Sequence, residues 1–291
     1  MTLNVLVFGR TGQVGSALAS RSDGNLSIQA VGRETADLSD PVACAAVINR
    51  LKPDIVINAA AYTAVDSAES DDVTAMTVNA RAPGMMAEAT RKLRVPFLHV
   101  STDYVFSGNG VQPWRENDPP APINVYGATK RIGEQAVIGA NPDAIILRTS
   151  WVFNADGQNF VNAMLRAALT RDQLSVVDDQ FGSPTPADAI ADALLRIARR
   201  YSTGRGAPGL YHYCGAPATS WYGFAQEIFR HSGHPKPEIL PIPTSKWPCP
   251  AARPRFSVLD CSRILDVFGL EQPDWRTALE RMVSESRTEA A

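Results

Sequence analysis

Five short apolar runs, each rich in β-branched residues, constrain the fold of this chain more than any other feature of its sequence. They read NVLVFG, IQAVG, DIVINAA, PFLHVST and AIILRTS. Near-continuous apolar strands are typical of a parallel sheet that is covered on both faces. Segments of helical period lie between them at 13–20, 41–51 and 75–93. The alternation predicts an α/β fold built on a doubly wound parallel sheet, with ligands at the carboxyl ends of the strands.

Charge and cysteine usage narrow the class of partner. The 291 residues carry a net charge of -2 and contain no block of Lys or Arg, so neither nucleic acid nor a membrane surface is expected as a partner. No basic leader and no bilayer-length apolar run is present, which favours a cytoplasmic protein. The cysteines form no C-x-x-C pair, and we expect reduced thiols at Cys44, Cys214, Cys249 and Cys261.

A glycine-rich turn follows the first apolar run. Gly9, Gly12 and Gly15 have the spacing G-x-x-G-x-x-G and directly precede a segment of helical period. Glycine permits the tight turn and lets backbone N–H groups approach a pyrophosphate at a helix N-terminus. We therefore expect a Rossmann fold that binds a dinucleotide here. The other residues of the turn expected at the cofactor are Thr11, Gln13 and Val14.

The end of the second run bears on the choice of cofactor. Rossmann proteins that prefer NAD place an acidic residue there for the ribose hydroxyls, whereas this chain has Arg33. Because arginine can hold a 2′-phosphate by charge-assisted hydrogen bonds, we predict NADPH, with NADH as an alternative and a solvated surface arginine as the other interpretation. We expect Asp37 and Leu38 at the adenine. Beside the ribose and nicotinamide we expect Ala59, Ala60, Ala61 and Thr63.

The pattern becomes less regular and richer in proline after the fifth run. The segment around 187–200 is again helical in period, GLYHYCG is typical of a strand, and the proline-dense stretch near 235–256 does not suit central strands. We predict that residues 1–150, together with about 185–215, form the NADP-binding Rossmann domain. Residues 151–184 and 216–291 are predicted to form a smaller C-terminal α/β substrate-binding lobe.

A tyrosine and a lysine stand one helical turn apart in VYGATKRIGEQAV. Residues i and i+4 share a helix face, so Tyr126 and Lys130 can point at the same object. Hydride transfer to a carbonyl leaves an alkoxide that needs a proton, which a phenol can supply. Since the free pKa of tyrosine is about 10, we expect the Lys130 cation to lower the pKa of Tyr126 and to hydrogen-bond the nicotinamide ribose. Ser101 and Thr102 end the fourth run, and we expect one of them to hydrogen-bond the substrate oxygen.

Y-x-x-x-K with an upstream hydroxyl resembles the signature of the short-chain dehydrogenases/reductases, and the glycine turn resembles their extended branch, which acts on nucleotide sugars. The segments FGRTGQVG, NAAAYTAVDSAE, STDYVFSGNG, YGATKRIGE, RTSWVF, DDQFGSPT, GLYHYCG and ARPRFSVLD are similar, in order and over nearly the whole chain, to those of the dTDP-4-dehydrorhamnose reductases. That family reduces the C4 ketone of dTDP-4-dehydro-β-L-rhamnose with NADPH or NADH, the last step in making the rhamnose donor for cell-surface polysaccharide. The resemblance implies this activity and a nucleotide-sugar substrate.

The resemblance also implies roles for single residues. Tyr126 matches the family's proton donor, Lys130 its helper, and Thr102 the hydroxyl at the end of the fourth strand. Asp103 and Trp151 match positions that line the sugar pocket. Val65 is expected near that pocket.

A departure from the family concerns metal. Some members are dimers bridged by magnesium, which acidic residues hold, including one on the first helix. The corresponding segment here contains Ser16 and Ala17, so we expect no metal and either a monomer or a weak homodimer. His231 and His234 form an H-x-x-H before a proline, where histidines cap a helix end more often than they bind metal.

Two other functions stay open on the sequence. A nucleotide-sugar epimerase or dehydratase shares the glycine turn and the Tyr/Lys pair. Dehydratases place an acidic pair directly after the threonine that ends the fourth strand, whereas this chain reads Thr102-Asp103-Tyr104 there, which disfavours a dehydratase. Epimerases hold NAD tightly, and Arg33 favours an exchangeable NADPH instead. The second alternative is a non-catalytic binding role, because the regulatory β-subunit of methionine adenosyltransferase resembles this family and serves as a partner protein.

Overall fold

A six-stranded parallel sheet forms the centre of the molecule. The computed structural model describes residues 2–232 and 237–288, so His234 of the H-x-x-H lies outside the described residues. The strand order is β10-β5-β4-β3-β1-β2, and every neighbouring pair is parallel. The strands are β1 Leu3–Phe8, β2 Leu26–Val31, β3 Ile55–Asn58, β4 Phe97–Thr102, β5 Ile145–Thr149 and β10 Gly209–His212. The predicted parallel sheet is confirmed, and the five apolar runs supply its first five strands.

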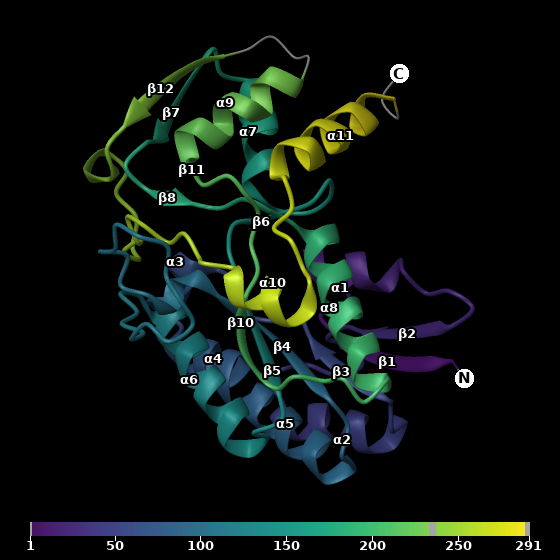
Figure 1. Ribbon diagram of the computed structural model, residues 1–291. Helices are drawn as coiled ribbons and strands as arrows, with labels where there is room; N and C mark the ends of the chain where they lie inside the picture. Colours follow the sequence, from purple (N-terminus) through teal and green to yellow (C-terminus); the bar gives the residue numbers. More distant parts are fainter. Residues whose placement is uncertain (1, 233–236, 289–291) are drawn as a thin grey trace.

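Helices cover both faces of this sheet. Helices α1 (Gln13–Ala19) and α8 (Ala187–Ser202) pack on one face, where their apolar residues join Val5 and Leu147 in one core cluster. The other face is covered by α2 (Pro41–Leu51), α5 (Ala82–Leu93) and α6 (Val125–Ala140), as Figure 1 shows. The strand order reverses at β1, with β2 on one side and β3 on the other, and doubly wound sheets bind ligands at the carboxyl edge of such a switch point.

The helix expected at 75–93 is longer and contains a π turn. It comprises α4 (Asp72–Met76), the π turn η1 (Thr77–Arg81) and α5. The wide turn carries the buried Asn79, whose side-chain oxygen Oδ1 accepts from the backbone N–H of Tyr62 at 2.8 Å. Its amide group donates to the backbone oxygen of Tyr62 and to Thr129 on α6. The π turn therefore fixes the segment after β3, which ends in the short helix α3 (Val65–Ala68).

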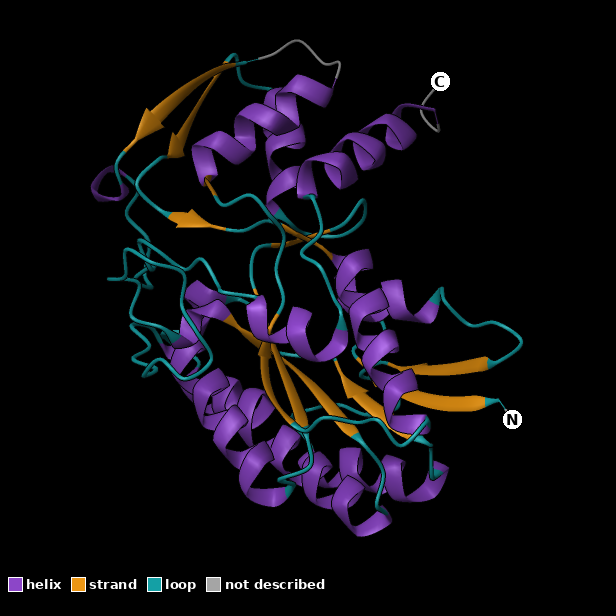
Figure 2. Cartoon of the chain, viewed as in Figure 1, coloured by secondary structure: helices purple, strands orange, loops and turns teal. Residues whose placement is uncertain are grey.

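A second lobe of short strands and helices lies beyond the carboxyl ends of the sheet (Figure 2). Its helices are α7 (Phe160–Ala168), α9 (Trp221–Ser232) and α11 (Trp275–Thr288). They share an aromatic core that includes the fully buried Trp275. Its strands form three pairs, β12-β7 and β6-β9 parallel and β11-β8 antiparallel: β6 Val152–Phe153, β7 Gln173–Val177, β8 Phe181–Gly182, β9 Thr185–Pro186, β11 Thr219–Ser220 and β12 Glu238–Ile242.

One late segment returns to the sheet. Helix α10 (Ser262–Phe268) lies beside β10 in Figure 1, and Ile264 and Phe268 join the core cluster of α1 and α8. The short 3-10 turns are η2 (Asp103–Val105) and η3 (Thr244–Lys246).

The exact domain boundaries stay a prediction, with residues 1–150 and about 185–215 in the Rossmann domain and residues 151–184 and 216–291 in the second lobe. Within the described residues, no helix combines the length and apolar character needed to cross a bilayer.

Candidate functional site

A cavity of about 690 Å³ opens at the carboxyl ends of β1, β3, β4 and β5. It brings together all but one of the residues that the sequence predicts for the site. From the cofactor set these are Gly9, Thr11, Gly12, Gln13, Val14, Arg33, Asp37, Leu38, Ala59, Ala60, Ala61, Thr63, Tyr126 and Lys130, and from the substrate set Val65, Thr102, Asp103 and Trp151. Gly15 does not line the cavity.

The glycine turn is closely packed. Gly9 has a φ of +101°, and a Cβ there would lie 2.9 Å from the backbone nitrogen of Ala60. At Gly15 a Cβ would overlap the carbonyl oxygen of Gly9. The two glycines therefore let the start of α1 approach β1 and β3. Gly15 serves the close contact between helix and strand, and acts on the cofactor site only through the shape of the turn.

The start of α1 suits a pyrophosphate. Gly12 is the N-cap, and within the described part of the chain no side chain caps this end. The exposed N–H groups of the first turn therefore face the cavity as donors for an anion. The amide of Gln13 on this turn donates to the backbone oxygen of Val152 at 3.2 Å, and Asn159 donates to its Oε1 at 3.1 Å. The turn is thereby tied to β6 and to the segment after it.

The other end of the cavity carries a cation. Arg33 follows β2, is exposed, and forms no salt bridge with any described residue, whereas nearby Arg10 binds Glu34 at 3.0 Å. The pKa of Asp37 is lowered by a hydrogen bond from the backbone N–H of Ser39, and also by the charge of Arg33. A free guanidinium at the end of β2 fits the 2′-phosphate of NADPH. The residues of this half of the cavity fit a dinucleotide.

The two hydroxyls at the end of β4 differ in what they bind. Ser101 lines the cavity, and its hydroxyl donates to Oε1 of Glu134 at 2.7 Å. Thr102 donates to Oδ1 of Asp103 at 3.0 Å, and its oxygen accepts from the backbone N–H of Tyr104 at 3.1 Å. Of the two hydroxyls left open by the sequence, that of Thr102 also hydrogen-bonds with Tyr126, and it is the one that we expect at the substrate oxygen.

The electrostatics of the Tyr126/Lys130 pair differ from the sequence expectation. Burial raises the pKa of Tyr126 to about 12, a hydrogen bond with Thr102 opposes this shift, and the charge of Asp103 adds to it. The expected lowering by Lys130 is therefore wrong for this structure, because residue spacing does not reveal burial. Lys130 donates to the backbone oxygen of Val100 at 2.7 Å, and burial lowers its pKa to about 8 despite the charge of Glu134. The phenol of Tyr126 is fully protonated at neutral pH, the form needed to donate a proton.

Two polar atoms at this end of the cavity lack partners among the described residues. They are Oδ2 of Asp103 and Oγ1 of Thr149. Burial raises the pKa of Asp103 to about 7, although hydrogen bonds from Ser257 and Thr102 oppose the shift. Buried polar groups without a partner are costly, so these atoms are suited to bind polar groups of a ligand. Thr149 was not predicted from the sequence.

Two stacked tryptophans form a wall of the cavity. Trp151 has a φ of +44°, and its ring stacks on Trp221 with 3.5 Å between centroids and 7° between planes. Both side chains are partly buried and both line the cavity. Trp221 begins α9 in the second lobe and was not singled out from the sequence. The sequence around Trp221, at the start of a helix, does not indicate that this residue contacts Trp151.

A buried ion pair lies under the site. The guanidinium of Arg148 on β5 binds Glu134 through two hydrogen bonds of 2.7 Å, and these side chains are 1% and 0% exposed. Arg131 binds the same carboxylate at 2.9 Å. The sequence reasoning missed this network, although an arginine inside the apolar run AIILRTS was a signal of a buried partner.

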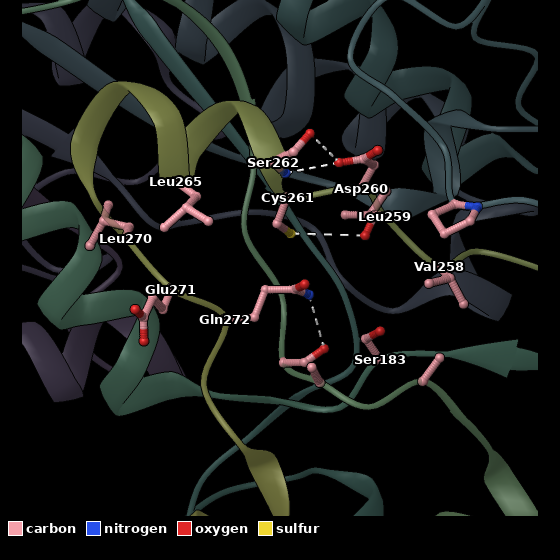
Figure 3. A pocket seen from close by; sticks show the side chains of 14 residues that line it. Ser183, Val258, Leu259, Asp260, Cys261, Ser262, Leu265, Leu270, Glu271 and Gln272 are labelled. Atoms are coloured by element: carbon pink, nitrogen blue, oxygen red, sulfur yellow. Dashed lines mark hydrogen bonds between the residues drawn. The ribbon is translucent and has the colours of Figure 1, made fainter.

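A second cavity of about 440 Å³ lies near α10 (Figure 3). Figure 3 shows Asp260 bonded to Ser262, and Gln272 extending below Cys261. None of the residues predicted for the site lines this second cavity. Within residues 2–232 and 237–288, no group of three or more His, Cys, Asp or Glu is arranged to hold a metal ion.

Known proteins resemble this chain over nearly its whole length. A family model described as the RmlD substrate binding domain matches residues 3–288. The dTDP-4-dehydrorhamnose reductase of Burkholderia thailandensis is 44% identical over 288 residues, which are 95% of this chain and 97% of that protein. The enzyme of the same name from Escherichia coli K12 is 40% identical over 298 residues, covering 99% and 100%. The solved dTDP-4-dehydrorhamnose reductase from Bacillus anthracis, in complex with NADP, has a TM-score of 0.91 and 33% identity, covering 98% and 100%.

Proposed function

Because the chain belongs to the dTDP-4-dehydrorhamnose reductase family, we propose that its cavity reduces the C4 ketone of dTDP-4-dehydro-β-L-rhamnose to the alcohol of dTDP-L-rhamnose. The protein is an oxidoreductase whose cofactor is NADPH, with NADH as an alternative. When bound, the cofactor supplies the hydride. The product is the donor of rhamnose for cell-surface polysaccharide.

Tyr126 is the proton donor in this proposal. Its phenol faces the cavity beside Thr102, and its raised pKa keeps the proton in place until negative charge develops on the substrate oxygen. Thr102 shares that oxygen through its hydroxyl and so stabilises the developing alkoxide. Lys130, whose amine lies in the same cavity, holds the nicotinamide ribose.

The cofactor lies along the carboxyl edge of the sheet in this proposal. Its pyrophosphate is held by the N–H groups of the glycine turn, and its 2′-phosphate by Arg33. Asp37 and Leu38 contact the adenine, and residues 59–63 contact the ribose. What supports this arrangement is that Arg33, Asp37, Leu38 and Tyr126 all line the same cavity.

The sugar lies against the second lobe. Asp103 offers its unpartnered Oδ2 to a sugar hydroxyl, and Trp151 packs on the sugar or nucleotide as a flat apolar wall. Val65 also lines the cavity and is expected near the sugar. We also propose that the enzyme works in the cytoplasm, where NADPH is available, as a monomer or weak homodimer without metal.

The observation that carries this proposal is the convergence of Thr102, Tyr126 and Lys130 with the glycine turn on one cavity. The test follows NADPH oxidation by absorbance with dTDP-4-dehydrorhamnose, alongside NADH and a UDP-4-ketosugar. We expect stoichiometric NADPH oxidation with the dTDP sugar. An epimerase would interconvert sugars without net oxidation. Silence in the assay together with capture of a methionine adenosyltransferase would instead indicate a partner protein.

A further inference from the structure

A chain of buried polar side chains leads from the end of β3 to Lys130. It consists of Asn58, His99 and Lys130, which are at most 2% exposed. Oδ1 of Asn58 accepts from the backbone N–H of Ala60 at 3.1 Å. Since this backbone group can only donate, the contact fixes the orientation of the Asn58 amide. Its nitrogen, Nδ2, must therefore point the other way, where it lies 3.1 Å from Nδ1 of His99.

This amide orientation determines the tautomer of His99. An amide nitrogen is only a donor, so Nδ1 of His99 must accept the hydrogen bond from Asn58. Burial holds the pKa of His99 well below its usual value, so the ring is neutral and carries one N–H. That N–H must then be on Nε2, the atom 3.4 Å from Nζ of Lys130.

The contact between Nε2 of His99 and Nζ of Lys130 therefore favours one protonation state of Lys130 over the other. An ammonium group has three donors and no lone pair, so it would face the N–H of His99 donor to donor. A neutral amine has a lone pair that can accept this N–H while Nζ still donates to the oxygen of Val100 at 2.7 Å. The geometry around Lys130 favours loss of its proton.

We infer that His99, held by Asn58 in its Nε2–H tautomer, is a positioning residue that controls the protonation of Lys130. The inference rests on the proposed function, since Lys130 acquires its meaning as the residue that holds the cofactor ribose. His99 does not touch the cavity. It acts through Lys130, and burial lowers the pKa of Lys130 in the same direction, to about 8.

The other charged groups around Lys130 either oppose the loss of its proton or do not contribute to it. On its own helix, Glu134 raises the pKa of Lys130, but this carboxylate is already bound by Arg148 from β5 and by Arg131. Tyr126 lines the same cavity, with Asp103 of η2 acting on it. The charged residues of the neighbouring α3, α4, η1 and α5 are at least partly exposed: Asp66, Asp72, Arg81, Glu88, Arg91 and Lys92. His99 is the group whose donor faces Nζ.

The tautomer can be measured directly on the protein without substrate. Long-range ¹H–¹⁵N spectra of histidine-labelled protein distinguish an Nε2–H ring from an Nδ1–H ring. The chain has 4 histidines, and the His99 signals are assigned by their loss in His99→Gln. We expect a neutral Nε2–H ring that does not titrate near neutral pH. An Nδ1–H ring in the wild-type protein overturns the inference whether or not any variant folds.

The effect on Lys130 is measured by ¹³C-detected titration of its Cε in labelled protein. In His99→Gln the amide can turn its oxygen towards the ammonium, so we expect the pKa of Lys130 to rise by about one unit, the scale of one hydrogen bond. His212→Gln is the matched control, because His212 is equally buried but contacts Arg148. An unchanged pKa of Lys130 in folded His99→Gln contradicts the inference. Failure of the ketosugar assay alone would overturn the proposed substrate and leave the tautomer intact.

Discussion

Replacing Glu134 by Gln should destabilise the fold strongly, because it leaves a buried cation without its counter-charge. The carboxylate accepts two 2.7 Å hydrogen bonds from Arg148 and one from Ser101. Removing one partner of a buried ion pair costs about 3–5 kcal/mol. Since the Gln amide oxygen can still accept from Arg148, we expect about 3 kcal/mol, a large share of the roughly 5–15 kcal/mol that stabilises a typical fold.

Urea unfolding followed by far-UV circular dichroism measures this cost. The matched control is Arg131→Ala, which removes a partner from the same carboxylate but a side chain that is 27% exposed. Ion pairs with a solvent-accessible partner contribute about 1 kcal/mol or less, and the Arg131 side chain keeps part of its contact with water. If Glu134→Gln lost no more stability than Arg131→Ala, the assignment of a tightly coupled buried pair under the site would be refuted.

Acid should reduce the difference in the free energy of unfolding between the wild type and Glu134→Gln. Burial opposes ionisation of Glu134, but its hydrogen bonds and ion pair with Arg148 prevail and hold its pKa below the usual 4.5. A lowered carboxyl pKa stabilises the folded state fully above pH 4.5, and this contribution is lost as the pH falls through the folded pKa. The stability difference between the wild type and Glu134→Gln should therefore shrink on acidification below pH 4.5 in the same urea experiment.

Three further variants test the cofactor and sugar assignments. Arg33→Asp should raise the KM for NADPH while use of NADH holds or improves, and equal loss with both cofactors in steady-state kinetics would leave Arg33 a structural role only. Trp151→Phe should raise the KM for the ketosugar, since it shortens the wall that stacks on Trp221; unchanged substrate affinity and turnover would remove Trp151 from the pocket. Lys130→Met should raise the KM for NADPH and lower kcat, and fluorescence titration showing wild-type NADPH affinity would contradict a ribose contact.

Local patterns were sufficient to predict the sheet and the position of the cavity. The apolar runs identify strands because strands covered on both faces have little room for polar residues. The glycine spacing and the Tyr126/Lys130 spacing each depend on one turn of chain, so both are readable without the fold. The return of α10 to the sheet joins residues far apart in sequence, and no local pattern in the sequence indicates it.

What the sequence could not provide is burial. Spacing places Lys130 near Tyr126 but says nothing of the desolvation that raises the pKa of the phenol. The π turn at η1 depends on the tertiary partners of Asn79, and the stacking of Trp151 on Trp221 joins two lobes. These features arise from contacts between distant elements, which local propensity does not encode.

The proton donor is the central claim, and kcat of Tyr126→Phe tests it most directly. Tyr104→Phe is the control, because it removes the same hydroxyl group from a neighbouring tyrosine. The ring of Tyr104 packs edge-on against that of Tyr126, with 5.7 Å between the ring centroids. General acid catalysis contributes about 10² to 10⁴ in rate, so Tyr126→Phe should lower kcat for dTDP-4-dehydrorhamnose by that order. NADPH affinity should hold, and Tyr104→Phe should stay close to the wild type. A Tyr126→Phe enzyme that keeps most of its kcat would contradict the mechanism.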